Sequence, residues 1–127
     1  MNLGLYIRDS APELSLEEQS YHLNKYADAH DWTVYKTYTD IGYSGLTTNR
    51  PGLQEMIRDV EAGKIDRVVI YRLDRLSRSS KDFAELLENV FIKNNVHLAS
   101  IVERVDTSTH EGTFLMGILI AQLGGIK

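Results

Sequence analysis

The sequence contains no cysteine and only two prolines in 127 residues. Without cysteine the chain cannot form disulfides or thiolate metal sites, which is compatible with a cytoplasmic protein. Long apolar runs are also missing: none reaches the roughly 18 residues of a membrane span, and the N-terminus lacks the basic and apolar regions of a signal peptide. We therefore expect a cytoplasmic protein that makes no contact with a membrane.

Net positive charge is lacking as well, because 14 lysines and arginines stand against 18 aspartates and glutamates. The net charge of −4 repels nucleic acid from the domain as a whole, so a polyanion would have to bind to a local cluster of cations. The chain contains such a cluster: Arg72, Arg75 and Arg78 occur at every third position after the apolar run 68–71. The spacing of the arginines is therefore more informative than their number.

Short apolar segments rich in β-forming residues alternate with amphipathic segments along the chain. The strands are predicted at 3–8, 32–39, 66–71 and 96–102. The helices are predicted at 16–30, 51–63 and 80–93, with a last one starting at about 110. This alternation predicts one three-layer α/β domain, with a mostly parallel sheet of four to five strands in flavodoxin-like order and helices on both faces.

Ligands of such a sheet bind beyond the carboxyl ends of its strands, in the crevice between the first and third strands. Here those ends carry Arg8-Asp9-Ser10 and the block 72–78. The Ser10 hydroxyl would face a cluster of guanidinium groups, and Arg50 would add a cation beside free backbone N–H groups at the start of the second helix. Arginine binds phosphate through paired hydrogen bonds, so the crevice is suited to phosphoryl transfer with arginines in place of a metal ion.

Ordinary structural explanations exist for the same residues. Arginines three apart are common on solvated helix faces, and a serine after a strand is more often a turn residue. Gln19, on the inward face of the first helix, equally fits a core glutamine bonded to backbone. The chain could instead be a non-catalytic oligomerisation module built on its apolar last helix. A further alternative is a magnesium-dependent phosphotransferase or receiver-like domain that uses Asp9, Asp40 and Asp74.

Several motifs, taken together and in order, resemble the catalytic domain of serine recombinases. They are Tyr6-Ile-Arg-Asp-Ser10, Ser15-Leu-Glu-Glu-Gln19, Asp40-Ile-Gly-Tyr-Ser-Gly45, Arg50-Pro51 and Tyr71-Arg-Leu-Asp-Arg-Leu-Ser-Arg-Ser79. Within that family the chain is most similar to large serine integrases and conjugative-transposon recombinases. The resemblance implies a resolvase-like fold and an origin in a bacterium, a phage or a mobile element.

The resemblance also implies cleavage and rejoining of DNA strands in site-specific recombination. Ser10 matches the nucleophile, which attacks a DNA phosphodiester and forms a 5′-phosphoserine link. The arginines that match those around the scissile phosphate are Arg8, Arg50, Arg75 and Arg78. The polar residues that match those shaping the site are Gln19, Ser44 and Asp74. The resemblance implies no metal or other cofactor, because the covalent link retains the phosphodiester bond energy. We interpret Asp74 as a residue that orients the guanidinium groups. The sequence does not identify the general base.

The implied partners are specific DNA sites and further copies of the chain, from dimer to tetramer. The segment 114–123 is apolar on almost every side, which suits a helix buried against another subunit. In the family this helix continues, whereas here Gly124-Gly125 follows it. We therefore expect residues 1–127 to be a single catalytic domain whose last helix is truncated. We also expect this chain to lack the downstream DNA-binding region and to be inactive alone. Asp9 stands where the family has a small apolar residue, and strand alternation predicts that it points away from Ser10.

Overall fold

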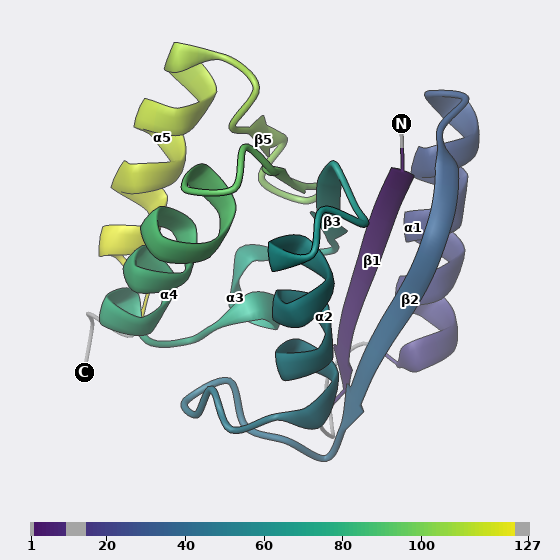
Figure 1. Ribbon diagram of the computed structural model, residues 1–127. Helices are drawn as coiled ribbons and strands as arrows, with labels where there is room; N and C mark the ends of the chain where they lie inside the picture. Colours follow the sequence, from purple (N-terminus) through teal and green to yellow (C-terminus); the bar gives the residue numbers. More distant parts are fainter. Residues whose placement is uncertain (1, 10–14, 124–127) are drawn as a thin grey trace.

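A five-stranded sheet forms the middle layer of the structure, a computed structural model that describes residues 2–9 and 15–123 (Figure 1). The strands are β1 (Asn2–Asp9), β2 (Thr33–Ile41), β3 (Arg67–Ile70), β4 (His97–Ser100) and β5 (Val105–Asp106). Their order is β2-β1-β3-β4-β5, in which only the pairing of β4 with β5 is antiparallel among the described residues. The predicted parallel order of the first four strands is confirmed. Ser10 and Gly124-Gly125 lie outside the described residues.

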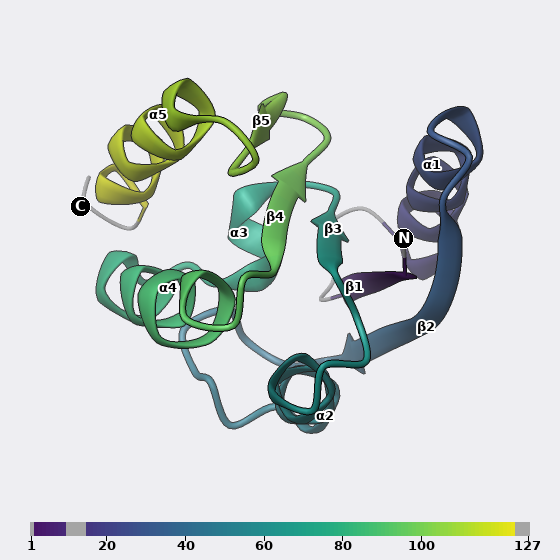
Figure 2. The same cartoon turned by 45° about the horizontal axis from the view of Figure 1, so that its top comes forward.

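Helices cover both faces of the sheet, as predicted (Figure 2). They are α1 (Leu16–Ala29), α2 (Pro51–Glu61), α3 (Leu73–Leu76), α4 (Ser80–Leu86), the π-helix η1 (Leu87–Ile92) and α5 (His110–Ala121). On one face α1 packs on alternate residues of β1, namely Leu3, Leu5 and Ile7. On the other face α2, α4, η1 and α5 share a larger core that includes Tyr6 and Val68. The alternation of β1 therefore separates two hydrophobic cores.

Local signals set the starts of the helices. The Ser15 hydroxyl accepts a hydrogen bond from the Glu18 backbone N–H at 3.2 Å and so caps the start of α1. Pro51 occupies the first turn of α2, where its missing N–H has no intrahelical partner to lose. Thr109 caps α5 by accepting from the Gly112 backbone N–H at 2.9 Å. These short-range patterns explain why the helix starts could be predicted.

Other boundaries differ from the prediction. The helix expected at 80–93 is α-helical only to Leu86 and continues as η1. The strand expected at 96–102 ends at Ser100, because residues 101–104 form a turn in which Arg104 has a φ of 56°. This turn leads into β5, which the sequence did not predict. The one-turn helix α3 was also missed, since four residues are too few to show a helical period.

The last helix, α5, is held at its start and only partly covered along its length. Met116 and Ile120 are buried against α4 and the sheet, whereas Phe114, Leu115 and Ile118 are exposed. The Thr113 hydroxyl donates to the Thr107 carbonyl at 3.1 Å. Within the part of the chain that the structure describes, no helix is long and apolar enough to cross a membrane.

Replacing Gly112 by alanine should destabilise the fold, because an added Cβ would lie 1.8 Å from the Asp106 carbonyl oxygen. We expect a loss of about 2–3 kcal/mol in the free energy of unfolding, measured by denaturant titration. Gly117 on the same helix has no heavy atom within 4 Å of the added Cβ. Gly117→Ala should therefore be neutral or stabilising by about 0.5–1 kcal/mol. Equal effects of the two substitutions would contradict this account of the β5–α5 contact.

Candidate active site

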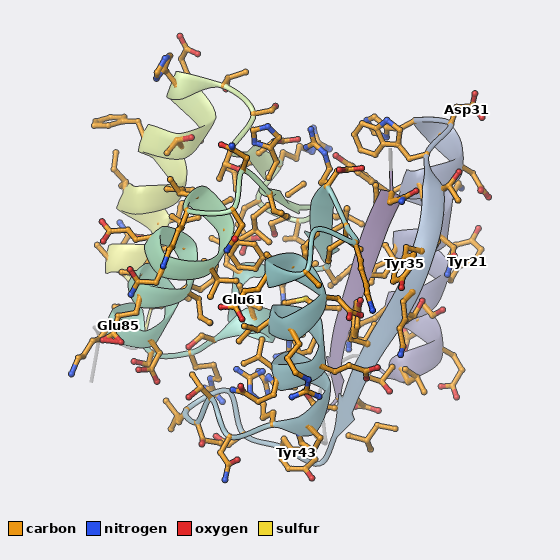
Figure 3. All side chains as sticks on the ribbon, viewed as in Figure 1. Tyr21, Asp31, Tyr35, Tyr43, Glu61 and Glu85 are labelled. Carbon is orange, nitrogen blue, oxygen red and sulfur yellow. The ribbon has the colours of Figure 1, made fainter. Side chains whose placement is uncertain are left out.

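Arg8 lies at the carboxyl end of β1 and is fully buried. Its guanidinium donates to the backbone carbonyl of Asp74 at 2.7 Å, of Tyr43 at 3.2 Å and of Arg75 at 3.3 Å. Tyr43 belongs to the loop after β2 and is labelled at the lower end of Figure 3, whereas Asp74 and Arg75 belong to α3. Arg8 therefore joins the ends of three segments that are distant in the sequence.

Arg75, in α3, binds the backbone of Arg8 in return. Its side chain is also fully buried, and Nη1 donates to the Arg8 backbone carbonyl at 3.2 Å. Its Nε donates to the Asp74 carboxylate at 3.0 Å, and the Arg72 guanidinium approaches the same carboxylate oxygen at 3.4 Å. Asp74 is about one-third exposed. The geometry brings Asp74 against two guanidinium groups, as an orienting residue would require.

Arg50 precedes α2 and is the third fully buried arginine of the cluster. Its guanidinium donates to the Thr47 carbonyl at 2.7 Å, to the Tyr6 hydroxyl at 2.7 Å and to the Leu76 carbonyl. A longer bond of 3.5 Å reaches the Arg75 carbonyl. Arg50 thus holds α3 against β1 and the loop before α2.

The expectation of free backbone N–H groups beside Arg50 is wrong. Asp40, at the end of β2, accepts from the N–H groups of Gly52 at 2.8 Å and Leu53 at 2.9 Å. The Tyr6 hydroxyl donates to the same carboxylate at 2.7 Å. Asp40 is 2% exposed, so these bonds replace its contact with water. An acid twelve residues upstream therefore caps α2 in place of a local side chain.

The carboxylates of Asp9, Asp40 and Asp74 do not form a metal site. The described residues contain no group of three or more histidine, aspartate or glutamate side chains with the geometry to hold a metal ion. Asp40 instead accepts hydrogen bonds from Tyr6 and from the start of α2, and Asp74 forms ion pairs with arginines. These contacts argue against the magnesium-dependent alternative, on the geometry of the donors.

Arg78 and Ser44 occupy the exposed side of the cluster. The Arg78 backbone N–H donates to the Gly45 carbonyl at 2.8 Å. A Cβ on Gly45 would lie 2.5 Å from the Arg78 Cγ and 2.9 Å from the Arg8 Nη2, so both arginine side chains pass close to this glycine. The Ser44 hydroxyl accepts from the Leu46 N–H at 3.0 Å and shapes the same loop.

Gln19 reaches the cluster from α1 and is fully buried. Its side-chain amide donates to the Arg8 carbonyl at 3.0 Å, the oxygen that Arg75 also approaches. This carbonyl is two residues before Ser10, which lies outside the described residues. Gln19 therefore connects α1 to the end of β1, just before the proposed nucleophile Ser10. It does so by binding a backbone carbonyl, as expected of a core glutamine.

Sequence reasoning missed the roles of Tyr6 and Asp40. Tyr6 lies in a quoted motif, and its alternation with Leu5 and Ile7 could have placed it in the crevice beside Arg8. Asp40 gave no local signal for a capping role, because its partners in α2 follow twelve and thirteen residues later. The structure brings Arg8, Arg50 and Arg75 together with both residues.

The stability of the protein should fall at alkaline pH. Burial raises the pKa of Tyr6 above the ordinary 10.0, Arg50 opposes this, and the hydrogen bond to Asp40 adds to it. Burial likewise raises the pKa of Tyr38, together with its hydrogen bond to Asp59. Because the folded pKa values are raised, the stabilisation is complete below the unfolded value of about 10 and is lost as the pH rises above it.

Tyr6→Phe tests this prediction by removing the hydroxyl that links Asp40 and Arg50. We expect a loss of about 1–3 kcal/mol in the free energy of unfolding near pH 8 and a smaller further loss near pH 11 than in the unmodified protein. Tyr35→Phe is the control, since the Tyr35 ring is exposed (Figure 3). Denaturant titrations at the two pH values measure both effects, and an unchanged pH slope in Tyr6→Phe would refute the assignment.

The arrangement as a whole concentrates guanidinium groups from four positions at the carboxyl ends of β1 and β3. Arg8, Arg50 and Arg75 form its buried part, and Arg78 forms its exposed part. Fixed cations in a partly desolvated setting stabilise an anion more strongly than cations in water. The cluster is therefore suited to bind a phosphate or to stabilise negative charge that develops during a reaction.

The comparisons with known proteins agree with this fold. The chain belongs to the family described as "Resolvase, N terminal domain", whose model matches residues 3–122. The predicted resemblance to serine recombinases is thereby confirmed.

Individual relatives carry related names. The chain is 45% identical over 76 residues to the transposon Tn917 resolvase of Enterococcus faecalis, which covers 60% of this chain and 40% of the relative. It is 35% identical over 78 residues to the DNA-invertase hin of Salmonella typhimurium, which covers 61% and 40%. The chain thus matches about two-fifths of the length of each of these relatives.

Among solved structures, the N-terminal catalytic domain of TP901-1 integrase is similar over nearly the whole chain. It shares 42% identity with a TM-score of 0.88, covering 95% of this chain and 92% of that one. The resolvase-like fold predicted from the sequence is confirmed.

Proposed function

We propose that this chain is the catalytic domain of a site-specific recombinase that cuts and rejoins DNA strands through Ser10. The observation that carries the proposal is the clustering of Arg8, Arg75 and Arg78 at the strand end that leads directly into Ser10. The names of the relatives, a resolvase, an invertase and an integrase, support the same reaction class.

In the proposed reaction the Ser10 oxygen attacks the phosphorus of a DNA phosphodiester. A new bond forms between phosphorus and the serine oxygen, the bond to the 3′ oxygen breaks, and the serine proton passes to a base. The 3′ oxygen leaves as a hydroxyl after taking up a proton, while the 5′ end stays linked to the protein. Attack of a 3′ hydroxyl on the phosphoserine reverses these steps, so rejoining needs no separate energy source.

The arginines would have different roles in binding the phosphate, depending on their exposure. Arg78 is exposed and reaches the phosphate directly, whereas Arg8 and Arg75 are buried and supply fixed positive charge behind it. Arg50 acts as a positioning residue, because its guanidinium binds Tyr6 and the carbonyls around α3. Asp74 orients Arg75 from within α3.

Gln19 and Ser44 would act through the backbone around the cluster. Gln19 fixes the carbonyl of Arg8, and Ser44 fixes the loop that passes Arg78. The proposal requires no metal or cofactor, since guanidinium groups neutralise the developing charge.

The proposed partners are specific DNA sites and further copies of the chain. The exposed apolar side chains of α5, Phe114, Leu115 and Ile118, form a surface that a second copy of the same helix could cover. We infer a dimer that assembles into a tetramer when two DNA sites are joined. Because the net charge is −4, we expect the arginine cluster to make the main DNA contact of this domain.

The proposal is tested by trapping the covalent intermediate. The full-length protein is incubated with total DNA of the organism that encodes it and then denatured, and the DNA-linked protein is digested for mass spectrometry. We expect phosphate on the peptide that contains Ser10, in equal amount with and without EDTA. An adduct that requires a divalent cation, or a phosphate on another residue, would favour the magnesium-dependent alternative.

A further inference from the structure

The turn between β4 and β5, residues 101–104, lies against the chain that leads from β3 into α3. The backbone N–H of Ile101 donates to the Ile70 carbonyl at 3.1 Å, and that of Val102 donates to the Tyr71 carbonyl at 2.9 Å. Arg104 adopts a left-handed backbone conformation, which turns the chain back into β5. The turn is therefore fixed at the point where the arginine-bearing segment begins.

Glu103 is the residue of this turn that contacts α3. Its two carboxylate oxygens lie 3.2 and 3.4 Å from the backbone nitrogen of Leu73, the first residue of the helix, which donates to them. The Ser100 hydroxyl donates to the same carboxylate. Arg72, at the N-cap position, makes no side-chain capping bond. Glu103 thus supplies, from 30 residues away, the acceptor that a local cap would supply.

The two ends of α3 are held by opposite charges. Glu103 places a carboxylate at the amino end, while Arg8 and Arg50 place guanidinium groups at the carbonyls of residues 74–76. The position of α3, and with it the side chains of Asp74 and Arg75, depends on all three contacts.

We propose that Glu103 is a positioning residue for strand cleavage, which fixes the start of α3 and so sets the placement of Arg75 relative to Ser10. The inference rests on the proposed function and adds to it a residue that does not itself touch the phosphate. The same turn continues through β5 into α5, so Glu103 also lies on the direct route from the proposed subunit interface to the arginine cluster.

The test compares Glu103→Ala, Glu103→Asp and Glu103→Gln in the full-length protein, with total DNA of the source organism as the probe. We expect Glu103→Ala and Glu103→Asp to slow adduct formation roughly 10- to 100-fold while leaving the affinity for DNA unchanged, because a small displacement of a catalytic group has effects of this size. Glu103→Gln keeps an oxygen that can accept from Leu73, and it should restore the rate to within about threefold of the original.

Glu61→Ala is the matched control, since it removes an exposed glutamate at the end of α2 (Figure 3). An unchanged rate in Glu103→Asp, which keeps the charge but shortens the side chain, would overturn the inference even if Glu103→Ala fails to fold. An equal loss in Glu61→Ala, or a parallel loss of DNA affinity, would overturn it as well. If the unmodified protein forms no adduct, the proposed function itself fails, which separates the two results.

Discussion

Ser10→Ala should abolish the covalent link between protein and DNA. If Ser10 is the nucleophile, its removal takes away the oxygen that carries the phosphate, so we expect the adduct to fall by about a thousandfold or more. The measurement is the amount of DNA-linked protein after denaturation, at equal protein concentration and with DNA of the source organism. Because serine and alanine differ by one oxygen atom, the fold and the affinity for DNA should stay nearly unchanged.

Ser108→Ala provides the control, since this exposed serine lies in the connection between β5 and α5. Its adduct should match that of the unmodified protein. Persistence of the adduct in Ser10→Ala would refute the assignment of the nucleophile. Loss of the adduct in both variants would instead point to a general effect on assembly.

Arg78→Ala and Arg75→Ala should both reduce cleavage by about a hundredfold or more, as expected when a donor to the transition state is removed. Their effects on stability should differ. Arg78 is exposed, so its loss should leave the melting temperature unchanged. Arg75 is fully buried and bonds to Asp74 and the Arg8 carbonyl, so its loss should also lower the free energy of unfolding by about 2–3 kcal/mol.

Single-turnover cleavage and thermal unfolding, measured on the same preparations, separate these effects. Arg58→Ala removes an exposed arginine from α2 and should change neither quantity. If Arg78→Ala lowers the melting temperature as much as Arg75→Ala does, Arg78 has a structural role. If Arg78→Ala cleaves normally, it is not a phosphate ligand.

The sequence was sufficient for the main elements because their signals are local. Ser15 and Thr109 mark helix starts by contacts with the third residue after them, and Pro51 marks one by its missing N–H. The alternation along β1 is visible in its apolar residues. The parallel direction of the first four strands then follows from the helices that connect them. The quoted motifs likewise singled out Arg8, Arg50 and Arg75, which the structure brings together.

The contacts that organise the site could not be predicted in this way. Asp40 accepts hydrogen bonds from the start of α2, twelve residues later, and Glu103 accepts one from the start of α3, 30 residues earlier. A pattern within a few residues cannot reveal either pairing. The distribution of exposure within the arginine block also depends on tertiary contacts: Arg75 is buried by Arg8 and Asp74, whereas Arg78 is not. Because Ser10 lies outside the described residues, its role stays a prediction from the sequence.

The wide sequence separation of these contacts has a consequence for folding. Arg8 binds a carbonyl 66 residues away, and Tyr6 binds Asp40 across 34 residues. We expect contacts between residues so far apart in the sequence to form late in folding, because loop closure must precede them. A nascent or partly unfolded chain would therefore carry Ser10 and Arg8 without Arg50 and Arg75 fixed beside them. The proposed cleavage activity should therefore appear only together with the fully folded domain.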